Sequence, residues 1–188
     1  MSDPILTTKR TYLRLINATH LDSIHQLLSF PEIDKYNTLG IPKDMEETKT
    51  IVNPLIADNL ADEITNYTLA IENKENNMFI GLFGLKLWGK KHRRGEVWYK
   101  ILPTHWDVGY ATEVLSAILV HGFDTLKLHR IQAGCAVDNV ASVSVLEKAG
   151  MTLEGRARQT LPLKTGWSDN FEYAILDTDQ RTKASTIS

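Results

Sequence analysis

The chain has 188 residues, of which 43% are hydrophobic and 23% are charged, and its formal net charge is −2 at pH 7. These values are typical of one globular domain over residues 1–188 with a polar, frayed tail from about 179 to 188, and they argue against a general nucleic-acid binder. The single cysteine, Cys135, excludes an intrachain disulfide, and without a membrane-spanning apolar run or a signal peptide we expect a cytoplasmic protein.

Residue spacing in the first half of the chain predicts one strand, two helical regions and a hairpin. Alternating side chains indicate strands, and apolar residues three or four apart indicate helices. In chain order we expect a strand at 10–15 and then a helix at 21–28, which begins after Asn17 or Thr19 and ends at Phe30-Pro31. A helical region at 44–60 follows, interrupted near Pro54. Strands at 67–72 and 78–88 come next, joined by a turn at 73–77.

The second half alternates strands with amphipathic helices. Here we expect a polar turn at 90–94, a strand at 95–102, a helix from Ala111 to about Leu119, a strand at 130–137, a short helix from Asn139 or Val140 to Lys148 with Gly150 as its C-cap, and two closing strands, the last at 171–176. This order predicts an α/β or α+β domain with a mixed sheet and helices on its faces.

The stretch from Glu96 to Thr112 carries the strongest functional signal. It predicts a strand, a proline-marked turn and a Gly-x-Ala start to a helix, with Gly109 and Ala111 as the small residues. The first N–H groups of a helix have no internal partner and lie at the positive end of the helix dipole. Small residues let an anion approach those groups closely, so we expect a phosphate-bearing ligand here.

Five motifs follow one another along nearly the whole chain. They are Lys9-Arg10-Thr11-Tyr12-Leu13-Arg14, Ile80-Gly81-Leu82-Phe83-Gly84, Glu96-Val97-Trp98-Tyr99, the run from Pro103 to Glu113, and Asp138-Asn139-Val140-Ala141-Ser142 with Leu146 to Met151 and Leu153-Glu154-Gly155. In this order they resemble the GCN5-related N-acetyltransferases (GNAT), specifically their RimJ/RimL-like branch. The resemblance implies a mostly antiparallel mixed sheet of about seven strands, splayed between the fourth and fifth.

The resemblance implies acetyl-coenzyme A (CoA) as co-substrate and no metal, and the histidines show no metal-ligand spacing. The pyrophosphate would lie on backbone amides from Val108 to Thr112, and the pantetheine arm would run beside the strand that ends at Ile101 and Leu102. The residues implied in cofactor binding are Ile101, Leu102, Trp106, Val108, Gly109, Tyr110, Ala111, Thr112, Asn139 and Ser142.

Acetyl transfer to an amine needs a base, an oxyanion donor and a proton for the leaving thiolate. Glu96 is the candidate base, because a primary amine is mostly protonated at pH 7 and a carboxylate can accept its proton; alternatively, Glu96 pairs with a neighbouring arginine. A backbone N–H near Ile101 would meet the oxyanion. Ser142 would donate to the thiolate, with a plain surface serine as the alternative, and Asn139 could serve only as an N-cap. Cys135 we expect to be a buried structural thiol.

This chain departs from the branch at several positions of its motifs. Asp107 and Val108 stand where relatives have glycine and a basic residue, so we expect Asp107 to weaken pyrophosphate binding unless it points away or caps the helix. Trp98 replaces a common glycine. Val145 stands where many relatives have a tyrosine that protonates the thiolate. RimL-like enzymes also place a carboxylate shortly after the Glu-Gly turn, and the corresponding stretch near Leu161 has none.

The leading functional hypothesis is acetylation of a protein N-terminal amine of the ribosomal-protein type, by direct attack in a ternary complex. Residues 1–66 carry a net charge of −4 and the remainder +2, so the first third would attract cationic amines, although an acidic face that is simply solvated is the alternative. A small amine such as a polyamine is a second possible acceptor, and a non-catalytic acyl-CoA-binding module is a third hypothesis. A homodimer is plausible from the resemblance, and no membrane partner is expected.

Overall fold

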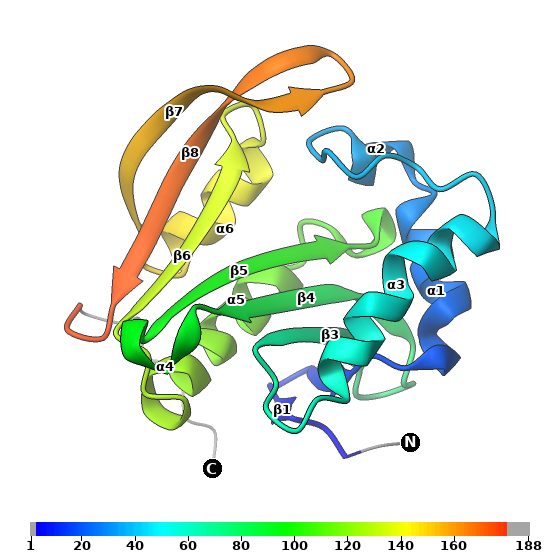
Figure 1. Ribbon diagram of the computed structural model, residues 1–188, viewed down its shortest axis with the longest axis horizontal. Coiled ribbons are helices and arrows are strands. Elements are labelled where there is room, and N and C mark those ends of the chain that lie inside the picture. The colour runs from blue at the N-terminus through cyan, green and yellow to red at the C-terminus, as the bar shows by residue number, and fades with distance from the viewer. Residues whose placement is uncertain (1–2, 180–188) are drawn as a thin grey trace.

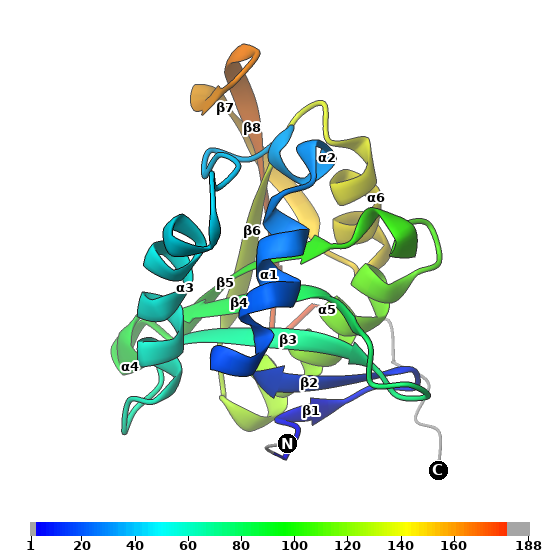
Figure 2. The same cartoon turned by 90° about the vertical axis from the view of Figure 1, so that its right-hand side faces the viewer.

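The computed structural model describes residues 3–179 as an eight-stranded sheet with helices on both faces (Figures 1 and 2). The strand order is β1-β2-β3-β4-β5-β6-β8-β7. The strands are β1 (Leu6–Thr7), β2 (Thr11–Leu15), β3 (Asn66–Asn73), β4 (Phe79–Leu87), β5 (Arg94–Ile101), β6 (Arg130–Ala136), β7 (Thr152–Leu163) and β8 (Gly166–Leu176). The two-residue β1 brings the total to one more than expected from the sequence.

The pairing of β5 with β6 is parallel, whereas every other neighbouring pair is antiparallel. It covers only three residue pairs, from Arg94 opposite Arg130 to Glu96 opposite Gln132. Beyond Glu96 the two strands diverge, which is visible in Figure 1. The expected splay is therefore present, and β1 makes its flanking strands the fifth and sixth.

The helices divide between the two faces of the sheet. They are α1 (Leu21–Leu28), α2 (Pro31–Asp34), α3 (Met45–Asn59), α4 (Gly89–His92), α5 (Tyr110–Val120) and α6 (Val140–Lys148). Two separate apolar clusters show the division, because α1 and α3 pack in one and α5 and α6 in the other. In the described part of the chain no helix is long and apolar enough to cross a membrane.

Side chains of β5 alternate between these two clusters, as the pleat of a strand requires. Val97 and Ile101 are buried in the cluster of α5 and α6, and Tyr99 packs against it. Trp98 packs against the cluster of α1 and α3. Glu96 and Lys100 therefore face α1 and α3, on the opposite side of the sheet from Tyr99.

Most predicted elements are confirmed, and the differences lie at residues that were expected to end or interrupt them. Asn17 is the N-cap of a 3₁₀ turn that leads into α1, and Gly150, with φ 85°, follows α6. The predicted interruption at Pro54 is wrong, because α3 continues through it. Pro54 is exposed, so the carbonyl freed by its missing N–H can bind water. The segment predicted as a polar turn contains the single turn α4.

Other differences lie at the end of the chain. The last hairpin is longer than predicted, because β8 begins at Gly166 rather than near Phe171. The frayed tail predicted from about 179 falls almost wholly outside the described residues.

Trp98 fits the sheet because Gly84 lies directly opposite it on β4. A Cβ atom at Gly84 would come within 2.0 Å of the Trp98 indole ring. The tryptophan that departs from the family pattern is thus accommodated by a glycine on the neighbouring strand.

We predict that Gly84→Ala lowers the free energy of unfolding by about 1–3 kcal/mol, because the methyl group displaces the Trp98 ring from a packed position. Gly155→Ala is the matched control, since a Cβ there would meet only a carboxylate oxygen of Glu172, at 3.9 Å. Urea unfolding of both variants checks the prediction, and equal losses in the two would contradict it.

Candidate functional site

The loop before α5 offers backbone N–H groups that no side chain caps. Gly109 is the N-cap residue of α5, with φ 85°, and no side chain accepts a hydrogen bond from the first turn. The N–H groups from Gly109 to Thr112 therefore lack the partners that helix interiors have. The exposed Asp107, at φ 58°, does not cap the helix, so that alternative from the sequence is wrong.

Arg10 supplies this loop with a positive charge that its own motif lacks. Its Nη1 donates to the Val108 carbonyl at 2.9 Å, and its guanidinium lies 4.3 Å from the centre of the Tyr110 ring. Its Nε pairs with Glu113 of α5 at 2.6 Å. Together with the Thr8 hydroxyl, which donates to the same carboxylate, Arg10 lowers the pKa of Glu113 despite its partial burial.

The free edge of β5 leads to this loop. The backbone groups of Arg94 and Leu102 form hydrogen bonds on the β4 side of the strand. Successive residues of a strand direct their backbone groups to opposite sides, so those of Tyr99 and Ile101 point toward the opening. The Ile101 carbonyl accepts the Trp106 indole N–H at 2.7 Å, which leaves the Ile101 N–H for a ligand. Leu102 donates to Ile80 and accepts from His105, so only its side chain remains for contact.

Ser142 lies on the other wall of the opening. The Asn139 side chain accepts a hydrogen bond from the Ser142 N–H at 3.2 Å, which confirms Asn139 as the N-cap of α6 and Ser142 as a first-turn residue. The Ser142 hydroxyl lies 2.9 Å from the Tyr99 hydroxyl. Burial raises the pKa of Tyr99 to about 12, so this phenol keeps its proton at physiological pH.

Cys135 is 7% exposed, as predicted for a structural thiol. Burial raises its pKa, and a hydrogen bond with Ser142 opposes that rise.

Glu96 stands at the last paired position before the strands separate. Its side chain makes no ion pair with any residue between 3 and 179, so the predicted alternative of an arginine partner is wrong. Its carboxylate and the Ser142 hydroxyl come from opposite faces of the sheet and flank the same opening. Val145 packs half-buried against the core one turn further along α6.

Three charged residues meet where the opening widens. Asp34 of α2, 5% exposed, pairs with Lys164 of the β7–β8 turn at 2.5 Å. Burial lowers the pKa of Lys100 to about 8, and the charge of Asp34 partly opposes this. None of the three was predicted as a site residue, because they come from separate elements and belong to no motif.

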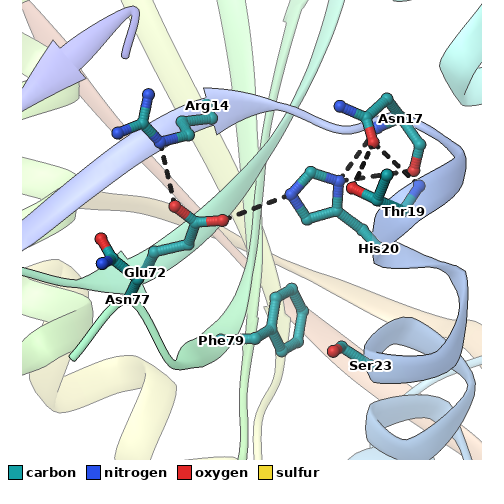
Figure 3. A pocket seen from close by; sticks show the side chains of 8 residues that line it. All are labelled: Arg14, Asn17, Thr19, His20, Ser23, Glu72, Asn77 and Phe79. Atoms are coloured by element: carbon teal, nitrogen blue, oxygen red, sulfur yellow. Dashed lines mark hydrogen bonds and ion pairs between the residues drawn. The ribbon is translucent and has the colours of Figure 1, made fainter. Parts of the chain in front are cut away.

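A polar hollow of about 200 Å³ lies beside the first turn of α1, and Figure 3 shows the side chains that line it. Its central carboxylate, Glu72, accepts from Arg14 at 3.0 Å and lies 3.4 Å from the His20 Nε2. The Asn17 N–H donates to the His20 Nδ1, so Nε2 carries the proton and donates to Glu72. Arg14 and Glu72 are thus paired within the wall, and His20 links the 3₁₀ turn to β3 through Glu72.

Comparison with known proteins assigns the fold to a family. The profile of the Acetyltransferase (GNAT) domain matches residues 10–152. The chain belongs to the GNAT family of acetyltransferases. It is 35% identical over 173 residues to the uncharacterized N-acetyltransferase YoaA of Bacillus subtilis, covering 92% of this chain and 97% of that one. This GNAT domain is therefore an N-acetyltransferase.

Two further relatives have named acceptors. The spermidine N-acetyltransferase of Vibrio cholerae, solved in complex with CoA and spermine, superposes with a TM-score of 0.78 at 26% identity over 89% of this chain and 95% of that one. The ribosomal-protein-serine acetyltransferase of Escherichia coli is 21% identical over 178 residues, 94% of this GNAT domain and 99% of that protein.

Lys100 gives a pH-dependent stability prediction. Its pKa is lower in the folded chain, about 8, than the usual 10.5, so between these values the unfolded chain binds more protons and stability rises with pH. Lys100→Met should stabilise the protein at pH 7 by up to about 3 kcal/mol, and this gain should shrink toward pH 10.

Urea unfolding of wild type and variant across this pH range measures that gain. Lys86→Met, at an exposed position of β4, is the matched control. A gain that stays constant with pH would contradict the stated cause.

Proposed function

We propose that this chain transfers an acetyl group from acetyl-CoA to a primary amine, foremost the N-terminal amine of a protein, by direct attack in a ternary complex. The observation that carries the proposal is the free edge of β5 that runs from Glu96 to the uncapped start of α5. We take the whole chain, tail aside, as a single acetyltransferase domain.

Backbone N–H groups along this edge and in the loop after it could bind the acyl end and the pyrophosphate of acetyl-CoA. Backbone N–H groups between Val108 and Thr112 would bind the pyrophosphate, assisted by the Arg10 guanidinium beside the loop. Gly109 has a φ of 85°, a conformation that favours glycine, and a Cβ there would only make an ordinary contact, at 3.6 Å, with that guanidinium. The Ile101 N–H would bind the acyl end of the bound molecule, which supplies an activated acetyl thioester.

Glu96 would take the proton from the acceptor ammonium, directly or through water. Its carboxylate has no competing cation in the described chain and lies on the face that α1 and α3 flank. The Ile101 N–H would stabilise the oxyanion of the tetrahedral intermediate, because a fixed backbone donor needs no reorganisation.

Ser142 would hold the proton that the leaving sulfur requires, in place of the tyrosine that Val145 replaces. Tyr99 is the residue that would position it: the phenol keeps its proton, and by donating it to the Ser142 oxygen 2.9 Å away it would let the Ser142 hydrogen turn from Cys135 toward the sulfur of the cofactor.

Two acceptor classes remain within this proposal. Similarity to a ribosomal-protein-serine acetyltransferase over nearly the whole chain supports a RimJ/RimL-like role on protein N-termini. Similarity to a spermidine N-acetyltransferase favours a small amine as the alternative. Incubation with acetyl-CoA and panels of peptides and amines, read by mass spectrometry, separates the two. Binding of CoA without any acetylated product would favour a non-catalytic module instead.

We predict that Glu96→Gln lowers kcat by roughly 100-fold at neutral pH, in line with loss of a general base. The loss should shrink as pH rises toward the pKa of the acceptor, because the amine is then already neutral. The pH profile of kcat measures this, and Glu75→Gln in the exposed β3–β4 turn is the control. An unchanged rate would remove Glu96 as the base.

We predict that Ser142→Ala lowers kcat by roughly 100-fold and that Tyr99→Phe lowers it by about 10-fold, with KM for acetyl-CoA little changed. Ser144→Ala, in the same helix, is the matched control. Steady-state kinetics with the preferred acceptor checks both. A Tyr99→Phe enzyme with full activity would show that the phenol does not position Ser142.

A further inference from the structure

A buried carboxylate with an unused oxygen lies where the opening meets the last hairpin. The side chain of Asp34 is 4% exposed, and its Oδ2 pairs with the Lys164 ammonium. Its Oδ1 is buried and has no hydrogen-bond partner among residues 3–179. A buried carboxylate oxygen without a donor is costly, so this arrangement calls for a further donor.

The cation that holds Asp34 can leave easily. The Lys164 side chain is 65% exposed and comes from the turn between β7 and β8. Figures 1 and 2 show α2 close to the tip of that hairpin. Lys164 loses little packing when its ammonium returns to water, whereas Asp34 stays enclosed. Both residues line an open hollow of about 380 Å³ with Pro31, Glu32, Lys35 and Ile41.

Lys100 connects this carboxylate to β5. Burial lowers the pKa of Lys100 and the charge of Asp34 partly opposes this, but the Lys100 ammonium does not donate a hydrogen bond to the Asp34 Oδ1. Lys100 and Glu96 lie on the same face of the strand, and four residues of extended chain span roughly 13 Å. Asp34 is therefore placed away from the proposed base, toward the wide end of the opening.

Resting on the function proposed above, we propose that Asp34 binds a second, non-reacting ammonium of the acceptor, which replaces the Lys164 ammonium. The preferred acceptor is then dicationic: one amine is acetylated near Glu96, and another cationic group is held by α2. A polyamine and a peptide with a basic residue after its free N-terminus share this chemistry.

The second ammonium fits this site better than the reacting one. Asp34 lies toward the wide end of the opening, away from Glu96 and from the Ile101 N–H that would bind the acyl end of the cofactor. An amine held by Asp34 would therefore be out of reach of the acetyl group. For a group that stays charged throughout, the same contact adds binding energy and selects the acceptor.

Opposite effects of two substitutions test the proposal. Asp34→Asn should raise KM for a dicationic acceptor by roughly 10-fold or more, because a charge-assisted hydrogen bond is lost. Lys164→Met should lower the same KM, because it removes a competing ammonium. If the ion pair merely fastens the hairpin, both substitutions break it and both raise KM, which would overturn the proposal.

Matched acceptors separate the second charge from other effects. Hexane-1,6-diamine is compared with hexylamine, and a peptide beginning Ala-Lys with one beginning Ala-norleucine. KM for the monocations should stay within about twofold in both variants, and the pair that shows the effect identifies the acceptor class. KM for acetyl-CoA should stay unchanged.

A binding readout keeps the test independent of turnover and folding. In the presence of CoA, the diamine should raise Tm of the wild type, more so of Lys164→Met, and not of Asp34→Asn. If Asp34→Asn does not fold, the change of KM in Lys164→Met decides alone: a lower KM for the dicationic acceptor supports the Asp34 site, and a higher one overturns it. Acetylation without these differences overturns only the Asp34 site, whereas no acetylation of any amine overturns the proposed function.

Discussion

The pairing of β5 with β6 stops after Glu96, and the site depends on that stop. Three parallel residue pairs fix the two strands at one end, after which β5 stays with β4 and β6 stays with β8. The backbone of β5 then has unused donors and acceptors on one side. The Tyr99 hydroxyl reaches across the resulting gap to the hydroxyl and the carbonyl of Ser142.

The gap also keeps two kinds of chemistry apart. Glu96, Lys100 and Asp34 approach it from the side of α1 and α3, where carboxylates and cations gather. Tyr99 and Ser142 approach it from the side of α5 and α6 and carry only neutral hydroxyl groups. If the proposed roles of Glu96 and Ser142 hold, proton removal from the amine and proton delivery to the sulfur would take place on different faces of one sheet.

Local patterns in the sequence were enough to predict most strands, the start of α6 at Asn139 and the uncapped start of α5. Asn139 could be assigned because a helix cap depends on neighbouring residues, whereas the left-handed N-cap conformation of Gly109 was not predicted. The prediction at Pro54 was wrong, because whether a proline interrupts a helix depends on what its freed carbonyl faces. That carbonyl faces water here, which follows from how α3 packs on the sheet and not from the local sequence.

The contacts that the sequence could not predict join distant parts of the chain. Arg10 lies 98 positions before Val108, to whose carbonyl it donates, so the charge missing from the loop motif comes from the bend between β1 and β2. Lys164 reaches Asp34 from the far end of the chain. Side chains of this kind follow no spacing rule, because their neighbours are set by how the elements pack.

The attachment of Glu113 to the N-terminal segment also governs the order of events during synthesis. Thr8 and Arg10 must wait for a partner that is 105 and 103 residues downstream. At typical translation speeds that wait lasts roughly 5–20 s, during which the first strand has neither its carboxylate nor its place beside α5. The contacts that hold the loop before α5 can therefore form only when the N-terminal segment meets a part of the chain that is made much later.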